Sequence, residues 1–299
     1  MCSSDLSAVA SGKLFDLPAD KLSQCISMAA VPNVILRQVR MGHYSMYKAV
    51  ASGHAGRAGV FAAILARAGM EGPHLPFQGK GGWCTHVARD KIDIALGGYG
   101  APFKIQHSLI KPRACCGTTI SSVLAAEHVA PLRDLDAVQK ITVEVYKKAK
   151  ERVGTGEHRW NPDTRETADH SMPYVTGVAL KYGRIALEYF DDPYLHDETL
   201  LELVSRIKCE VSEEANKREP EAMLCDLTMT LRNGTRHDIR VEHHRGHPRN
   251  PMPDAEIEEK FRELAGEQMT KAQCDALLAR LWTLDQMKDM GELFALTRI

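Results

Sequence analysis

Apolar residues recur with two different periods along the chain, and the change of period divides it into regions. In the first 40 residues they recur every three or four positions, which predicts a helix that starts at Pro18 or Asp20 and stops at Pro32-Asn33. A longer helix is predicted from about 45 to 68, and it is rich in Ala, Gly and Ser. Because small side chains let helix backbones approach closely, this region predicts a crowded helical core.

From about residue 139 the apolar residues alternate with polar ones, which is typical of strands with one buried face. The alternating segments are 139–145, 207–211, 225–231 and 235–242. Asn233-Gly234 joins the last two and predicts a hairpin, since Asn-Gly suits the tight turn between antiparallel strands. Helices are predicted between these segments, at about 118–130, 172–182 and 197–205. This order of elements predicts an α+β unit with an antiparallel sheet.

After the last strand the helical period returns, with helix starts predicted at Asp254 and Thr270. The sequence therefore predicts a mainly α protein with an inserted α+β domain. Both chain ends, residues 1–106 and 250–299, are expected to form an all-helical body. Residues 107–249 are expected to form an antiparallel-sheet lid domain over it, with the functional site in the cleft between the two.

The composition narrows the classes of partner. The chain has 299 residues, of which 44% are apolar, and a net charge of −1, so we expect neither nucleic acid nor a membrane as a partner. No uninterrupted apolar run approaches the roughly 20 residues that span a bilayer. The eight cysteines form no paired framework, and the start of the chain, Met1–Asp5, is polar. We therefore expect a reducing, cytoplasmic setting.

The densest group of reactive side chains lies between Arg165 and Tyr174, at the start of the helix predicted over 172–182. Ser171 is suited to cap this helix, and Pro173 is tolerated in its first turn because the backbone N–H there has no partner in the helix. The segment therefore predicts a group of polar side chains held at a helix N-terminus.

His170 and Tyr174 are the candidate acid–base residues of this segment. At a helix N-terminus, His170 would lie where free N–H groups attract anions and where the helix dipole favours the neutral imidazole. Asp169 either orients His170 or balances its charge. The alternative is a polar loop that caps a helix and has no chemical role.

Cations occur in two other segments. Lys111 and Arg113 flank a proline just before the helix predicted over 118–130, where free N–H groups favour a bound carboxylate. Lys48 lies at the start of the small-residue helix. From composition alone its ammonium group is expected to reach solvent, as that of most lysines does.

The cysteine and histidine spacings do not favour a metal site. Cys115-Cys116 is one compact pair and Cys84 with His86 is another, but neither has C-x-x-C or H-x-x-x-H support. We therefore expect no metal, no iron–sulfur cluster and no cofactor. A redox or metal sensor built on Cys115-Cys116 is kept as a less favoured alternative.

Arg165-Glu-Thr-Ala-Asp-His-Ser-Met-Pro-Tyr174 resembles the R-E-x-A-D-H-S-x-P-Y motif of the MmgE/PrpD family, which includes 2-methylcitrate dehydratase. Three further segments resemble the same family in the same order, and these are Ser45–Lys48, Ile110–Cys116 and Gly246–Met252. The resemblance covers essentially the whole chain, but family members are longer and have a further helical segment in front. It implies a homodimer packed through helices, or a separate chain that supplies the missing segment.

The resemblance also implies roles for individual residues. Lys48 and Lys111 match substrate-binding lysines of the family, so Lys48 is expected to point into a cleft after all. We assign Lys111 to catalysis as well, together with His170 and Tyr174. Arg113 and Ser171 complete the expected set of substrate-binding residues.

These assignments lead to the hypothesis of a cofactor-free hydro-lyase acting on a 2-hydroxy di- or tricarboxylate such as 2-methylcitrate. A base removes the proton next to a carboxylate, cations stabilise the negative charge, and an acid protonates the departing hydroxyl. The family also includes a cis-aconitate decarboxylase and an iminodisuccinate epimerase, so the resemblance does not fix the reaction. A truncated homologue without catalysis, or one half of a split two-chain enzyme, is the alternative from a different class.

Overall fold

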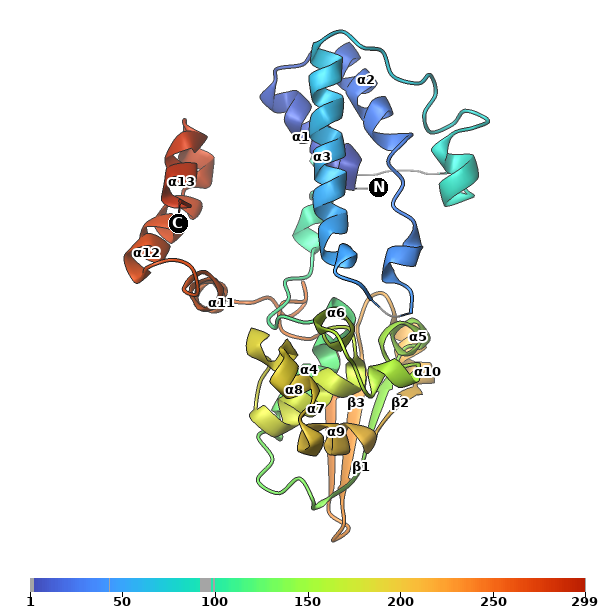
Figure 1. The fold of residues 1–299 in the computed structure, drawn as a ribbon, viewed down its shortest axis with the longest axis vertical. Helices are drawn as coiled ribbons and strands as arrows, with labels where there is room; N and C mark the ends of the chain where they lie inside the picture. The colour runs from blue at the N-terminus through green and yellow to red at the C-terminus, as the bar shows by residue number, and fades with distance from the viewer. Residues whose placement is uncertain (1–2, 43, 92–97, 99, 299) are drawn as a thin grey trace.

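The N-terminal part of the chain is a bundle of closely packed helices. A computed structural model describes residues 3–42, 44–91, 98 and 100–298. Helices α1 (Ser3–Leu14), α2 (Ala19–Ala30) and α3 (Tyr47–Arg67) lie side by side in Figure 1. A Cβ atom at Gly59 of α3 would lie 2.5 Å from the carbonyl oxygen of Ser4 in α1, so the close packing needs the small residue. The predicted small-residue helix over 45–68 is confirmed.

Helix α3 has a second property that the sequence analysis did not anticipate. It is long and apolar enough, by length and composition alone, to cross a membrane. About 33% of its most apolar window is buried within the chain, where its alanines pack on α1 and α2. Core helices pass the same test, so this is weak evidence for a membrane.

The C-terminal half of the described chain is built on a four-stranded sheet with the order β2-β1-β3-β4. The strands are β1 (Val138–Val145), β2 (Ile207–Val211), β3 (Cys225–Leu231) and β4 (Arg236–Val241). β3 pairs antiparallel with both β1 and β4. The turn between β3 and β4 contains Gly234 at a φ of +87°, so the hairpin predicted from Asn233-Gly234 is confirmed.

The prediction of an antiparallel sheet is wrong for one pair of strands. β1 and β2 are parallel, with Ile141 opposite Ile207. Alternation shows which face of a strand is buried, but it does not show the direction of the neighbouring strand. The chain between β1 and β2 forms several helices, and a connection of that length allows parallel pairing. The sheet is therefore mixed.

Helices pack against the sheet and enclose the main apolar core, to which Ile120, Val178, Leu200 and Leu227 all contribute. The helices are α4 (Ile120–Glu127), α5 (Lys147–Val153), α6 (Arg165–Ala168), α7 (Met172–Tyr182), α8 (Asp192–Leu195), α9 (Glu198–Ser205) and α10 (Glu213–Arg218). α4, α7 and α9 confirm the three predicted helices. α5, α6, α8 and α10 were not predicted, because one or two turns give too few positions for a periodic pattern.

Shorter helical turns link these elements along the chain. Turns of 3-10 helix span Arg37–Arg40, Lys104–His107, Gly117–Thr119, Glu157–Arg159, Leu187–Phe190 and Leu284–Gln286, and a π-helical turn spans Cys84–Ala88. The turn over Gly117–Thr119 leads directly into α4 and follows the two adjacent cysteines.

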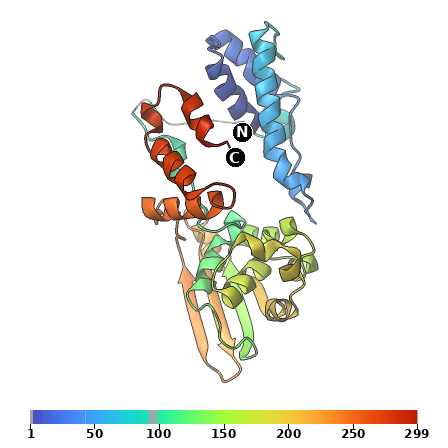
Figure 2. The same ribbon diagram turned by 60° about the vertical axis from the view of Figure 1, so that its left-hand side comes forward.

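The C-terminal helices α11 (Asp254–Ala265), α12 (Lys271–Leu281) and α13 (Met290–Leu296) lie together, apart from α1–α3 in Figure 1 and above one end of the sheet in Figure 2. The described chain therefore does not form the single helical body expected from both ends. Periodicity predicts a helix but does not identify the surface that it covers. The helix start predicted at Thr270 is confirmed, and the structure adds a capping box there between Thr270 and Gln273. The domain limits given above stay a prediction.

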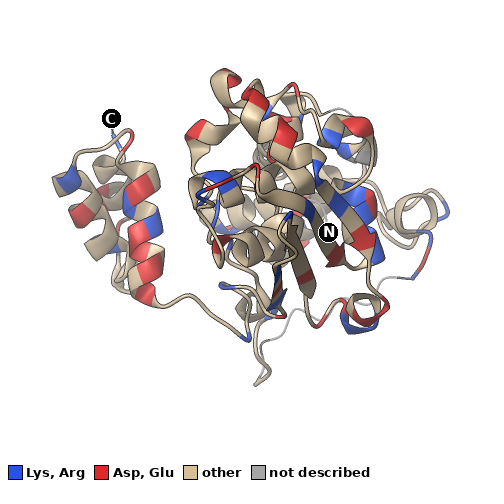
Figure 3. Cartoon of the chain, turned by 90° about the horizontal axis from the view of Figure 1, so that it is seen from below, with Lys and Arg blue, Asp and Glu red and all other residues tan. Residues whose placement is uncertain are grey.

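Positions of Lys and Arg alternate with positions of Asp and Glu along the ribbon in Figure 3, including the C-terminal helices. The mixture agrees with the net charge of −1. The expectation of no nucleic-acid partner stays a prediction.

Candidate active site

Two successive helix caps hold the reactive segment in place. Thr164 caps α6, where its hydroxyl oxygen accepts a hydrogen bond from the Thr167 N–H at 3.2 Å. Ser171 caps α7, where its hydroxyl oxygen accepts from the Tyr174 N–H at 3.0 Å. Each cap satisfies an N–H group that the helix itself leaves without a partner. Residues 169–170 therefore lie in a fixed turn between two helices.

Lys48, in the first turn of α3, contacts this turn from the N-terminal helices. Its Nζ lies 3.2 Å from Asp169 Oδ2, 3.3 Å from Asp169 Oδ1 and 3.0 Å from His170 Nδ1. His170 is 8% exposed, so these charges interact with little screening by water. The structure brings Lys48 and His170 together from parts of the sequence more than a hundred residues apart, as the site hypothesis requires. Their chemical roles stay predictions.

Tyr44 fixes how the two parts meet, and sequence reasoning missed it. Its backbone N–H donates to Thr167 Oγ1 and its carbonyl accepts from Thr164 Oγ1, each at 3.4 Å. Its buried ring meets the His170 ring edge-on at 5.0 Å, and the Arg159 guanidinium lies 4.7 Å from its centre. The one signal in the sequence was that Tyr44 directly precedes a family-like segment.

Nδ1 of His170 has a partner in either protonation state. When Nδ1 carries a proton it can donate to Asp169 Oδ1, which is in hydrogen-bond contact, and when it does not it can accept from Lys48. Burial lowers the pKa of His170, but hydrogen bonds with Asp169 and Cys116 raise it more, so the pKa is raised overall. This shift is opposite in direction to the bias toward a neutral imidazole expected from the helix dipole, because partners in direct contact outweigh the dipole.

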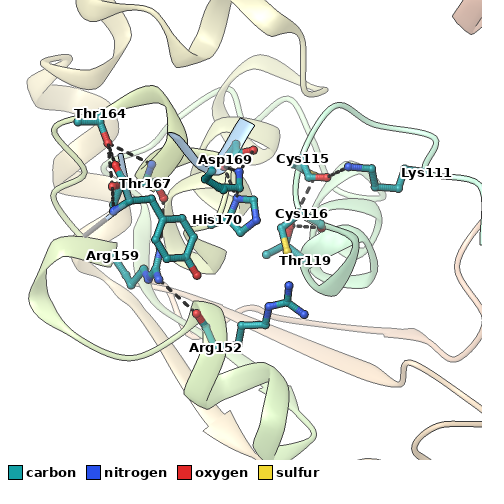
Figure 4. A network of polar contacts seen from close by, with 12 residues as sticks. Lys111, Cys115, Cys116, Thr119, Arg152, Arg159, Thr164, Thr167, Asp169 and His170 are labelled. Atoms are coloured by element: carbon teal, nitrogen blue, oxygen red, sulfur yellow. Dashed lines mark hydrogen bonds and ion pairs between the residues drawn. The ribbon is translucent and has the colours of Figure 1, made fainter. Parts of the chain in front are cut away.

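Cys116 adds a thiol to this group from the position just before the 3-10 turn Gly117–Thr119. Its N–H donates to the Asp169 carbonyl at 2.9 Å, which holds the cysteine against the turn that carries His170. Burial raises the pKa of this thiol, but His170 and Thr118 lower it more, to about 7. Figure 4 shows His170 close to both Asp169 and Cys116. We call Lys48, Asp169, His170 and Cys116 the His170 cluster.

Lys111 and Arg113 have different surroundings. Lys111 Nζ donates to the Cys115 carbonyl at 2.9 Å, which places this ammonium on the cysteine side of His170 in Figure 4. Arg113 instead forms a two-bond ion pair with Glu127, at 2.7 and 2.8 Å. The structure therefore brings Lys111 close to the His170 cluster, whereas the guanidinium of Arg113 already has a carboxylate partner.

The Gly246–Met252 segment helps to position the backbone next to Lys111. The Gly246 carbonyl accepts from the Ile110 N–H at 2.9 Å. A Cβ atom at Gly246 would lie 1.9 Å from the Ile110 carbonyl oxygen, so only glycine allows this approach. Lys260 of α11 donates to the carbonyl of Lys111. These contacts fix the backbone of Lys111 from two other parts of the chain.

The hydroxyl groups of Ser171 and Tyr174 are used within the fold. Ser171 Oγ donates to the Arg159 carbonyl in addition to capping α7. Tyr174 is fully buried and its hydroxyl donates to the Tyr189 carbonyl at 2.7 Å. Burial and the nearby Asp197 raise the pKa of Tyr174. The geometry thus does not bring the predicted catalytic and binding hydroxyls to the His170 cluster.

We expect Tyr174→Phe to lower the free energy of unfolding by about 1 kcal/mol and to leave turnover close to wild type. The change removes the hydroxyl that donates to Tyr189 and keeps the buried ring. Urea unfolding measures the first quantity and the substrate assay proposed below measures the second. A large loss of kcat at unchanged stability would instead restore the catalytic role predicted from the sequence.

Metal ligands are not grouped in the part of the chain that the structure describes. There, no three His, Cys, Asp or Glu side chains lie close enough together to hold a metal ion. Cys115 and Cys116 are both free thiols. The absence of a metal and of a cofactor from the reaction stays an expectation.

Two sequence models of protein domains match the chain. The MmgE/PrpD N-terminal domain matches residues 6–94 and the MmgE/PrpD C-terminal domain matches residues 114–284, which is more than half of the chain. Lys48 lies in the first match, and Cys116, Asp169 and His170 lie in the second. The His170 cluster is therefore assembled from both domains.

Curated proteins with similar sequences include cis-aconitate decarboxylases and a cis-aconitate decarboxylase-like protein. A cis-aconitate decarboxylase-like protein of Aspergillus oryzae is 24% identical over 98% of this chain and 63% of its own length. Cis-aconitate decarboxylase of Aspergillus terreus is 24% identical over 97% of this chain and 62% of its own length. The Mus musculus cis-aconitate decarboxylase is 25% identical over 46% of this chain and 28% of its own length. The chain spans less than two-thirds of the length of these relatives.

Proposed function

Because the chain belongs to the MmgE/PrpD family, we propose that it is a lyase that moves a proton at a carbon next to a carboxylate of a small polycarboxylate. The observation that carries the proposal is the meeting of Lys48 and His170, with 3.0 Å between Nζ and Nδ1. The cis-aconitate decarboxylases among its relatives support lyase chemistry on such acids. At 24% identity they do not identify the substrate.

Each charged group near His170 has a task in such a reaction. Lys48 and Lys111 bind carboxylates of the substrate and stabilise the negative charge that develops when the C–H proton leaves. His170, oriented by Asp169, exchanges a proton with the substrate. A bound carboxylate would share the Lys48 ammonium with Asp169, so substrate binding would weaken this ion pair.

The finer proposal is dehydration of a 2-hydroxy di- or tricarboxylate such as 2-methylcitrate. Its support is the motif over Arg165–Tyr174, which resembles the dehydratase branch of the family. In this reaction an acid protonates the departing hydroxyl while cations hold the carboxylates. The second candidate is decarboxylation of cis-aconitate, which the names of the relatives favour. Both reactions place negative charge on a carbon beside a carboxylate.

An assay over a small panel of acids tests the proposal and separates the two candidates. The panel contains 2-methylcitrate, citrate and cis-aconitate, and the readouts are new C=C absorbance and released carbon dioxide. We expect turnover that is lost in His170→Asn and retained in His128→Asn, since His128 is an exposed residue at the end of α4. A pure, folded chain that converts none of these acids would contradict the proposed function and favour a homologue without catalysis.

We also propose that the chain functions in the cytoplasm as a homodimer packed through helices. Large apolar side chains are exposed along α3, at Val50, Val60, Phe61 and Ile64. Burying such a face against another helical surface is favourable. Light scattering of the pure chain is expected to give twice the monomer mass. A monomer that associates only after a separate helical chain is added would favour the split enzyme.

A further inference from the structure

The two adjacent cysteines differ in their chemical surroundings although both are buried. Cys115 is 1% exposed and accepts a hydrogen bond from Thr119 Oγ1 at 3.4 Å, and burial raises the pKa of its thiol to about 12. Burial also raises the pKa of the Cys116 thiol, but His170 and Thr118 lower it more, to about 7. The pKa values of the two neighbouring thiols are thus shifted in opposite directions, so Cys115 is a matched control for Cys116.

Several contacts fix the position of the Cys116 thiol. Its backbone N–H is tied to the Asp169 carbonyl at 2.9 Å, and its carbonyl accepts from Thr119 Oγ1 at 2.8 Å. Burial raises the pKa of this thiol, but His170 and Thr118 lower it more. A thiolate is stabilised by nearby donors and by a neighbouring imidazolium. These surroundings suit Cys116 to exchange a proton with His170.

The charged and titratable groups around this pair come from every element packed against it. Asp169 lies on the turn before α7, and Lys48 comes from α3. Tyr146, at the end of β1, interacts with the charges of Cys116 and of Arg152 on α5. Lys111 approaches from the loop before α4, with its ammonium on the Cys115 carbonyl. One lysine thus contacts His170 and the other contacts the neighbour of Cys116, and both are suited to hold carboxylates.

We propose that Cys116 is a further catalytic residue of this site, the base that takes the proton from the substrate carbon while His170 acts as the acid. The inference rests on the proposed lyase function and deepens it by dividing the proton transfers between two residues. Neither the sequence motif nor the match to the family assigns this role to the second cysteine of the pair.

The proton transfers balance within the pair. The Cys116 thiolate takes the proton from the carbon next to a carboxylate, forming S–H and leaving the C–H electron pair on the substrate. That pair forms the C=C bond as the C–O bond breaks, and His170 gives its proton to the departing hydroxyl, which leaves as water. The thiol then returns its proton to the neutral imidazole, so the pair recovers its initial state without a co-reactant.

The first test is alkylation of the wild-type chain by iodoacetamide, followed by mass spectrometry of each cysteine. We expect the alkylation rate of Cys116 to rise through pH about 7, since only the thiolate reacts. We expect citrate, used as the polycarboxylate probe, to slow alkylation of Cys116 and to leave the half-buried Cys84 unaffected. A Cys116 rate that rises only above pH about 8.5, or that citrate does not change, would overturn the assignment.

The second test compares Cys116→Ser with Cys115→Ser. We expect Cys116→Ser to lose about 10²–10⁴-fold in kcat, because a serine hydroxyl does not ionise near neutral pH, and to change KM little. We expect Cys115→Ser to retain wild-type kcat. Thermal unfolding of both variants checks that they fold. Equal kcat in Cys116→Ser and wild type would overturn the role of the thiol and leave the lyase proposal intact.

The two proposals fail in different ways. If the wild-type chain converts no acid in the panel, the proposed function fails. The alkylation experiment then still decides whether Cys116 is an ionised thiol at a polycarboxylate-binding site. If citrate slows the alkylation of Cys116 and the rate rises near neutral pH, the polycarboxylate site is supported. If citrate does not change the rate of Cys116 alkylation, the site is excluded.

Discussion

Replacing Lys48 with alanine is expected to lower kcat/KM for the polycarboxylate substrate by about 10²–10³-fold. Removing one preorganised charge-stabilising donor from an active site has an effect of this size. Among the described side chains of α3, Lys48 is the one that hydrogen bonds to Asp169 and His170. The variant therefore loses a carboxylate-binding cation and also loses a contact that positions His170. Steady-state kinetics over the acid panel measures the effect.

Lys148→Ala is the matched control for this prediction. The Lys148 side chain is 75% exposed, and its ammonium pairs with Glu219 at 3.1 Å. Exposed ion pairs contribute little to stability, so kcat/KM and the unfolding midpoint should both stay near wild type. Wild-type turnover in Lys48→Ala, measured on a folded protein, would exclude Lys48 from the site.

Gly246→Ala is expected to lower both the free energy of unfolding and turnover. Gly246 has a φ of +87°, which costs an alanine about 1–2 kcal/mol. The added Cβ would also lie 1.9 Å from the Ile110 carbonyl oxygen, so the two loops must separate. Overpacking of this kind costs a further 1–3 kcal/mol, roughly. Because Lys111 directly follows Ile110, we expect turnover to fall together with the free energy of unfolding.

Gly234→Ala is the control that separates backbone strain at positive φ from the clash with Ile110. Gly234 has the same φ of +87°, but a Cβ there would meet no atom within 4 Å. The control variant therefore shows the effect of backbone strain alone, and turnover should be unchanged. Urea unfolding of both variants gives the difference that belongs to the clash with Ile110. Equal destabilisation of the two variants would show that the loop moves aside without cost and does not hold Lys111.

Much of the local structure could be predicted from the sequence. The cap at Ser171, the hairpin at Asn233-Gly234 and the helix start at Thr270 depend on side chains and backbone conformations only a few residues apart. Short helices such as α5 escaped prediction, because one or two turns carry too little pattern. The choice of Lys48, Lys111 and His170 as site residues came from motifs that resemble a family.

The sequence by itself determined the positions of the strands and of many longer helices, the family, and the segment around His170. The reason is that periodicity, capping and turn chemistry act between near neighbours in the chain. The tertiary structure decided that β1 and β2 are parallel, that Tyr44 joins the start of the Lys48 segment to the helix before His170, and that Cys116 lies close to His170. It also gave Arg113 and Tyr174 partners within the fold. The physical reason is that protonation and hydrogen bonding depend on groups brought within about 3 Å by folding, and no local pattern records which distant groups these will be.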